Sequence, residues 1–210
     1  EAFAESTANV TAVTGGTVNL PCNITAPTSD DTVAMILWYK GESKTPIYAL
    51  DARRGTLDEA KRLAMRNKMF MNTTTKPAVL MIEDLVEDDA GKYLCSVYFR
   101  KHWNIDFNVS LKLILPPEKP VIMNSNGKTL STLIGPYNEG DRLVLICEVN
   151  SGNPPPSVTW WRDSVLIDET YERTDKGATR NEFQIKSLQR HDLMAMLTCK
   201  ASNNNITIPS

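Results

Sequence analysis

The feature that most constrains this chain is a cysteine–tryptophan–cysteine frame that occurs twice, once in each half. The first frame is Cys22, Trp38 and Cys95, and the second is Cys147, Trp160 and Cys199. Four cysteines can pair in three ways, and only pairing within each half gives two similar closed loops with a tryptophan inside. A tryptophan packed on a disulfide between two facing sheets forms a sandwich core. The frames therefore predict two β-sandwiches with the disulfides Cys22–Cys95 and Cys147–Cys199.

The same cysteines indicate where the protein works. Each disulfide should stabilise its sandwich by about 4 kcal/mol, because it restricts the unfolded chain. Disulfides persist in oxidising compartments, so we expect an extracellular protein. Five Asn-x-Ser/Thr sequons agree with that location. The candidate glycosylation sites are Asn9, Asn23, Asn72, Asn108 and Asn205.

Alternating apolar runs separated by turns predict an all-β fold of two tandem immunoglobulin-like sandwiches. The interval from Cys22 to Cys95 is the longer one and leaves room for two extra strands, so residues 1–116 are expected to form a variable-type domain. Residues 117–210 are expected to form a constant-type or intermediate-type domain. The prolines that follow Leu115 mark the boundary. The short tail after Cys199 predicts that the second domain stops before or within its last strand.

Four side chains are predicted to build the two cores. Trp38 and Trp160 share the parity of inward-facing apolar neighbours. Tyr93 lies two residues before a frame cysteine, where a tyrosine corner ties a turn to the backbone upstream. Asp89 is expected to pair with Arg66 or Lys68. The acidic run that contains Asp89 could instead ligate calcium, but a buried salt bridge is the favoured interpretation.

The sequence argues against catalysis and against nucleic acid. A formal net charge of −2 does not favour phosphate binding. The two histidines lie in different halves, in no spacing that suits a zinc site or a nucleophile–base pair, and no glycine-rich phosphate loop is present. We therefore predict no enzyme activity, cofactor, metal or small-molecule substrate. The sequence also shows no signal peptide and no apolar run that could span a bilayer, as expected for a mature ectodomain of a membrane-anchored protein.

One sheet of the first domain is predicted to carry the binding surface. Its outward positions and the turn near residue 102 are rich in aromatic, aliphatic and arginine side chains, which favour interface hot spots. The predicted contact residues are Leu37, Tyr39, Ile47, Tyr48, Leu50, Tyr98, Arg100, His102 and Trp103. The alternative is that some of them lie under neighbouring loops. A docked domain would bury about 800 Å² on each side. Sugars at Asn9, Asn23 and Asn72 are expected on the opposite sheet, whereas Asn108 has the parity of the binding face.

Segments in both halves resemble one known family. Residues 16–22, 37–40 and 46–53 are similar to the first domain of the Sidestep family, insect cell-surface proteins of the nervous system, and residues 152–156, 188–193 and 197–203 extend the similarity. The resemblance implies a type I protein of the plasma membrane with further immunoglobulin domains. It also implies heterophilic binding, through the first domain, to immunoglobulin-superfamily receptors of the Beaten path family on another cell, in axon guidance and synaptic partner choice.

Two other binding functions compete with this interpretation. The same face could pair with itself in homophilic adhesion through a two-fold axis. An immune-type receptor uses the same sandwich, and the fold alone does not separate the two. Sedimentation of the protein distinguishes homophilic from heterophilic binding.

Overall fold

The computed structural model describes residues 7–210 and divides the chain into two compact units, unit 1 (Glu1–Leu113) and unit 2 (Ile114–Ser210). Each unit consists of β-sheets and one short 3-10 helix, within the described residues. This confirms the predicted all-β class. The prolines after Leu115 belong to unit 2, where Leu115 and Asn153 exchange two backbone hydrogen bonds of 2.9 and 2.8 Å.

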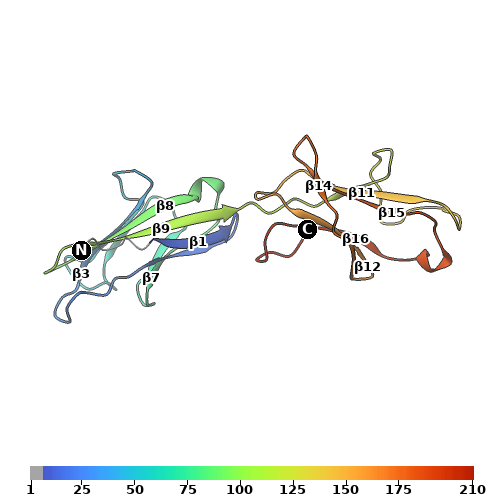
Figure 1. Ribbon diagram of the computed structural model, residues 1–210. Helices are drawn as coiled ribbons and strands as arrows, with labels where there is room; N and C mark the ends of the chain where they lie inside the picture. Colours follow the sequence, from blue (N-terminus) through green and yellow to red (C-terminus); the bar gives the residue numbers. More distant parts are fainter. Residues whose placement is uncertain (1–6) are drawn as a thin grey trace, which may run out of the picture. The chain divides into compact units, whose positions relative to one another are not determined.

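Unit 1 has a sheet of six strands, which we call the front sheet. Its strands, in spatial order, are β1 (Ala8–Val13), β9 (Ile105–Ile114), β8 (Gly91–Phe99), β3 (Val33–Lys40), β4 (Tyr48–Asp51) and β5 (Lys61–Ala64). Figure 1 shows β1, β9 and β8 side by side. The two extra strands predicted from the long cysteine interval are β4 and β5. The sequence analysis placed the strand that carries Asn9 in the opposite sheet. This was wrong, because that strand, β1, pairs with β9 in the front sheet.

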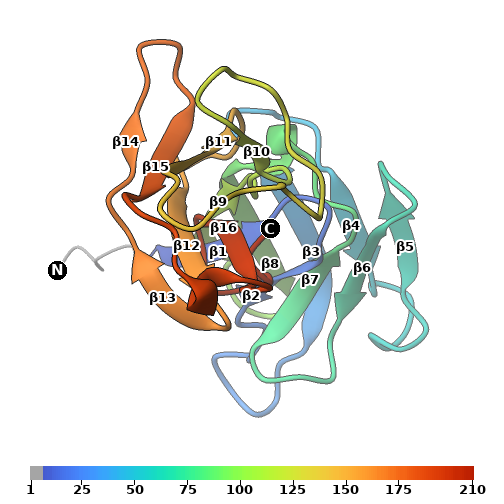
Figure 2. The same cartoon turned by 90° about the vertical axis from the view of Figure 1, so that its right-hand side faces the viewer.

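The opposite sheet of unit 1 has three strands. They are β2 (Val18–Cys22), β7 (Ala78–Ile82) and β6 (Met69–Asn72), and a 3-10 helix, η1 (Glu87–Asp89), precedes β8. β6 and β7 lie next to each other in Figure 2. The disulfide between Cys22 and Cys95 joins β2 to β8, with Cα atoms 6.2 Å apart, and thereby links the two sheets.

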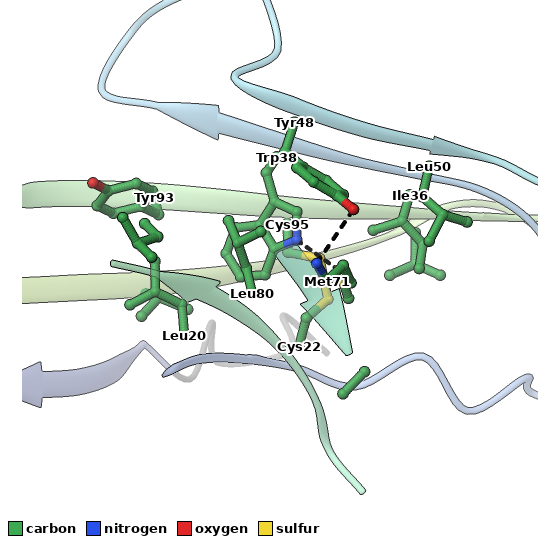
Figure 3. Packing of buried hydrophobic residues seen from close by; sticks show 14 of the residues in the cluster. Leu20, Cys22, Ile36, Trp38, Tyr48, Leu50, Met71, Leu80, Tyr93 and Cys95 are labelled. Carbon is green, nitrogen blue, oxygen red and sulfur yellow. Dashed lines mark hydrogen bonds between the residues drawn. A yellow bond between two sulfur atoms is a disulfide. The ribbon is translucent and has the colours of Figure 1, made fainter. Parts of the chain in front are cut away.

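The core of unit 1 is built around Trp38 (Figure 3). Its ring is fully buried beside the disulfide, and its Nε1 donates to the Met71 sulfur at 3.2 Å. The Met71 amide in turn donates to the Tyr48 hydroxyl at 3.2 Å. These contacts satisfy polar atoms that burial would otherwise leave without partners.

Tyr48 and Leu50 correct the sequence analysis, which placed both on the binding surface. Tyr48 is 2% exposed and Leu50 is fully buried. The strand register gives the reason, because Tyr48 pairs with Trp38 and Leu50 pairs with Ile36. Side chains directly opposite each other on paired strands share one face of a sheet. Both residues therefore lie in the core.

Unit 2 has a sheet of four strands and a sheet of three. The first comprises β10 (Val121–Met123), β11 (Leu143–Val149), β15 (Thr179–Ile185) and β14 (Glu172–Arg173), and the second comprises β13 (Val165–Asp168), β12 (Ser157–Arg162) and β16 (Leu197–Ser202). The 3-10 helix η2 (Arg190–Asp192) precedes β16. β13, β12 and β16 lie next to one another in Figure 2. Asp163 and Ser164 connect β12 to β13 with positive φ angles, as a two-residue hairpin turn requires.

The core of unit 2 repeats the frame of unit 1. Cys147 and Cys199 form a disulfide with Cα atoms 6.4 Å apart. Trp160 is fully buried, and its Nε1 donates to the Asn181 carbonyl at 3.2 Å. At the end of the chain, Ala201 and Ser210 exchange backbone hydrogen bonds of 2.8 and 2.9 Å.

Candidate functional site

The solvent side of the front sheet, here called the outer face, carries apolar side chains in neighbouring strands. Leu37 and Tyr39 lie on β3, Leu94 and Tyr98 lie on β8, and all four are partly exposed. Tyr39 pairs with Leu94, which brings two of them together across the strands. A sheet that faced only water would carry mainly polar residues on this side. The outer face therefore has the apolar character of a surface that binds another protein.

Sequence reasoning missed four members of this face. Leu94 and Met35 lie on β8 and β3, Ala49 pairs with Leu37, and Leu63 pairs with Ala49. Leu63 is 67% exposed. The parity of the residues around Cys95 would have identified Leu94. Leu63 requires the β4–β5 register, which the sequence does not contain.

Tyr39 lies near the end of β3, next to Leu94 of β8. Partial burial, followed by the nearby Tyr98 and Asp106, raises the pKa of the Tyr39 phenol. A tyrosine hydroxyl is protonated at physiological pH even without this shift, and it can donate a hydrogen bond to a partner. The ring also supplies apolar contact area, a combination that favours tyrosine at interfaces.

The turn between β8 and β9 (residues 100–104) is held by one buried carboxylate. The Asp31 side chain is fully buried and accepts hydrogen bonds from the amides of Arg100, Lys101 and His102, each at 3.1 Å. His102 Nδ1 lies 2.6 Å from Asp31 Oδ2. Burial opposes ionisation of Asp31, but the hydrogen bonds from His102 and from backbone amides outweigh it and lower the pKa of the carboxyl. The turn is thus fixed in place.

Trp103 lies at the tip of this turn and is 90% exposed. Burial of the Trp103 side chain in a complex would contribute substantially to the binding free energy, because aromatic side chains have a large apolar area. The Asp31 contacts hold the neighbouring backbone before any partner arrives. The backbone next to Trp103 therefore needs little further ordering when a partner binds.

Arg100 is not the free contact residue that the sequence analysis predicted, because it is hydrogen-bonded within unit 1. Its guanidinium donates to the carbonyls of Ala52 at 2.8 Å and Gly55 at 2.9 Å. These carbonyls belong to the connection between β4 and β5. Arg100 therefore fastens that connection to the β8–β9 turn, and much of its donor capacity is used within unit 1. Ile47, the remaining predicted contact residue, is half-buried and packs against the core.

The corner before Cys95 holds the other predicted structural groups, Tyr93 and Asp89. The Tyr93 hydroxyl donates to the Asp89 carbonyl at 2.6 Å, and Arg66 pairs with the Asp89 carboxylate at 3.0 Å. Asp84, in the same acidic run, pairs with Lys68. Among residues 7–210, His, Cys, Asp and Glu side chains form no group of three or more that could hold a metal ion. The described part of the chain also has no helix of the length and apolarity that a bilayer crossing needs.

Two sequons lie on the outer face. Asn9 is exposed on β1, where Ala8 and Val10 pack against the core, so its side chain points to solvent. Asn108 pairs with Leu94. The prediction that Asn9 lies on the opposite sheet was wrong, since β1 joins the front sheet. A sugar at Asn9 would stand on the edge strand β1, whereas a sugar at Asn108 would stand directly beside Leu94 of β8.

The other three sequons belong to other elements of the two units. Asn23 is exposed after β2, and its side chain accepts a hydrogen bond from the Thr25 amide at 3.0 Å. Asn72 ends β6 and accepts from the amide and the hydroxyl of Thr74. Asn205 is exposed in unit 2. Their modification stays a prediction.

Comparison with known proteins now adds to this geometry. The family described as Immunoglobulin V-set domain matches residues 5–114, and the one described as Immunoglobulin domain matches residues 119–203. These matches confirm the predicted order of a variable-type domain followed by a second immunoglobulin-type domain.

Curated relatives cover most of this chain at low identity. Cell adhesion molecule 2 of Xenopus tropicalis is 23% identical over 207 residues, which cover 96% of this chain and 42% of that protein. Lachesin of Drosophila melanogaster is 26% identical over 181 residues, covering 85% of this chain and 44% of that protein. The chain thus spans less than half the length of these relatives.

Solved structures show the same fold. The full ectodomain (Ig1–Ig3) of mouse nectin-like molecule 4 superposes with a TM-score of 0.58 at 18% identity, covering 96% of this chain and 62% of that one. The N-terminal eight immunoglobulin domains of Down syndrome cell adhesion molecule superpose with a TM-score of 0.57 at 18% identity, covering 95% and 22% of the respective chains.

Proposed function

Because this chain belongs to the immunoglobulin V-set domain family, we propose that unit 1 is a cell-surface recognition module that binds a protein partner through its outer face. The observation that carries this proposal is the set of partly exposed apolar side chains on adjacent strands, above all the pair Tyr39 and Leu94. The inner face of the same sheet already forms the core. A second apolar face on one sheet is a recognised feature of interaction sites.

The β8–β9 turn extends this surface. Trp103 is exposed at its tip, and Asp31 holds the turn by its backbone. Aromatic anchors near well-ordered backbone are typical hot spots, because little conformational entropy is lost when they bind. A partner domain that covers the outer face and this turn would bury about 800 Å² on each side, the size of a standard interface.

The finer proposal concerns the partner and its setting. The relative named cell adhesion molecule 2 supports adhesion at the cell surface. Adhesion-type immunoglobulin domains are generally non-enzymatic, which supports a binding role without catalysis. The resemblance to the Sidestep family supports a Beaten path-type immunoglobulin-superfamily receptor as the partner, with a role in axon guidance and synaptic partner choice.

A panel screen followed by matched variants tests the proposal. The tagged chain is applied to an array of immunoglobulin-superfamily ectodomains that includes Beaten path-type receptors and the chain itself. Leu37→Asp and Tyr39→Asp should each weaken binding of the partner found there by about 2 kcal/mol, because a charge would be buried at the contact. Met81→Asp is the control, since Met81 is a partly exposed apolar residue of β7 in the opposite sheet.

Each outcome has a clear meaning. Unchanged affinity of both outer-face variants would refute the proposed face, whereas loss of binding in Met81→Asp would assign recognition to the opposite sheet. Binding to the chain itself, with dimers in sedimentation, would establish homophilic adhesion through the same surface.

A further inference from the structure

The sequon at Asn108 lies within a strand, on the outer face itself. Asn108 belongs to β9 and pairs with Leu94 of β8, and Leu94 in turn pairs with Tyr39 of β3. Residues directly opposite each other on paired strands share one face of a sheet, and neighbouring strands lie about 4.8 Å apart. Asn108, Leu94 and Tyr39 therefore form a row across three adjacent strands of the outer face.

The alternation along β9 turns the sequon away from the core. Val109, between the two sequon residues Asn108 and Ser110, is 1% exposed and belongs to the core of unit 1. Successive side chains of a strand point to opposite faces, so Asn108 and Ser110 both point away from the core, and both are partly exposed. The amide nitrogen that would carry a sugar thus lies on the same side of the sheet as Leu94 and Tyr39.

The surroundings of Asn108 suit a covalently bound sugar. Along β9, the outward side chains of Asp106, Ser110 and Lys112 are polar, whereas Leu94 and Tyr39 on the next two strands have apolar surface. A pyranose ring has hydroxyl groups at its rim and C–H groups on its faces. The hydroxyl groups can therefore hydrogen-bond to the polar side chains of β9 while a ring face contacts the apolar row.

We propose that Asn108 carries an N-linked glycan whose first sugars cover Leu94 and Tyr39 and so restrict partner access to the outer face. The two disulfides are those of a protein made in an oxidising secretory compartment, where the sugar donor is a lipid pyrophosphate-linked oligosaccharide. The Asn108 amide nitrogen loses one proton and forms a bond to the anomeric carbon of the first sugar. The bond from that carbon to the pyrophosphate oxygen breaks, and the lipid pyrophosphate leaves.

The expected consequence is regulation of the outer face, so this inference rests on the proposed function. An N-linked glycan is bulky and hydrated. A partner that docks over Leu94 must displace the sugars from the apolar row and either order them or bury some of their hydroxyl groups. Both processes cost free energy. The glycosylated chain therefore binds its partner more weakly than the same chain without this glycan.

Two substitutions at Ser110 separate the effect of the sugar from that of the protein surface. Ser110→Ala removes the sequon and keeps Asn108, whereas Ser110→Thr keeps the sequon. The whole chain and both variants are secreted from eukaryotic cells, and peptide mapping by mass spectrometry measures the occupancy of Asn108. We expect a glycan at Asn108 in the unaltered chain and in Ser110→Thr. Asn205→Gln, which removes an exposed sequon of unit 2, is the control for loss of a sugar elsewhere.

Hydroxyl-radical footprinting tests the shielding without any partner. Leu94 and Tyr39 should be oxidised at least about three-fold more slowly in the unaltered chain and in Ser110→Thr than in Ser110→Ala, because bulky sugars exclude solvent. Phe70, which is 47% exposed on β6 of the opposite sheet, should be oxidised at one rate in all three proteins. An unmodified Asn108 in the unaltered chain, or equal oxidation of Leu94 and Tyr39 with and without the glycan, would overturn the proposal.

Partner binding then tests the regulation. With the partner found in the ectodomain screen, Ser110→Ala should raise the affinity at least about ten-fold, whereas Ser110→Thr and Asn205→Gln should leave it unchanged. Unchanged affinity in Ser110→Ala, together with weaker binding of Tyr39→Asp, would contradict this inference and leave the proposed function standing. Unchanged affinity in both Ser110→Ala and Tyr39→Asp would refute the outer face as the binding site, and this inference with it.

Discussion

At the turn before its second cysteine, unit 1 places Tyr93 against the carbonyl of Asp89, whereas unit 2 places Leu197 beside a hollow. The disulfide, the buried tryptophan and an arginine–aspartate pair occur in both units. The comparison teaches that the tryptophan–disulfide core does not depend on how this corner is filled. The corner can therefore differ between the two units while the shared core is kept.

The largest expected effect comes from removing the ring in unit 1. Tyr93→Ala should destabilise unit 1 by about 4 kcal/mol, because it leaves a cavity in a core position. Leu197→Ala in unit 2 should cost about 2 kcal/mol, since Leu197 is only partly buried. Amide hydrogen exchange of β8 and β16 reports each unit separately. Equal losses would show that the two corners are energetically alike.

The next prediction measures the contribution of the Tyr93 hydroxyl alone to the stability of unit 1. Tyr93→Phe keeps the ring but leaves the Asp89 carbonyl without its 2.6 Å donor, and unit 1 should lose about 1 kcal/mol. Urea unfolding monitored by exchange at β8 gives the value, with β16 as the internal control. A loss close to that of Tyr93→Ala would mean that the hydrogen bond, and not packing, dominates the corner.

A change in the reverse direction should stabilise unit 2. Leu197→Tyr adds apolar volume beside a hollow of about 460 Å³ and is expected to add about 0.5–1 kcal/mol to the stability of unit 2, in the range of cavity-filling substitutions. Slower hydrogen exchange of the β16 amides would show this gain in stability. Destabilisation of unit 2 would indicate that the turn before Cys199 does not accept a ring in this position.

The smallest effect is a pH dependence of unit 2. A hydrogen bond from the Gln189 amide lowers the pKa of Asp192 against the opposing effect of burial, and Arg162 and His191 lower it further. A lowered native pKa adds stability above the ordinary aspartate pKa of about 3.9, and this stability is lost as pH falls through the native pKa. The protection of the β16 amides against hydrogen exchange should therefore be constant from neutrality to about pH 5 and decline below about pH 4. Asp192→Asn should lack this component of the decline.

The sequence analysis predicted both tryptophan–disulfide cores and the role of Tyr93, because those features follow from the positions of cysteine, tryptophan and tyrosine along the chain. It failed for Tyr48 and Leu50, since alternation in a short strand gives two possible faces and the pairing with Trp38 and Ile36 selects one. It also could not place Arg100, whose partners Ala52 and Gly55 lie far away in the sequence. The hollow was not predicted, because its lining residues come from segments of unit 2 that lie far apart in the sequence.

The account rests on recognition by the outer face of unit 1. The most direct measurement is hydrogen–deuterium exchange of the whole chain, alone and with the partner found in the ectodomain screen. We predict slower exchange in β3 and β8 and in the turn that carries Trp103, with no change in β2 and β7. Unchanged exchange in β3 and β8 at saturating partner would contradict the account.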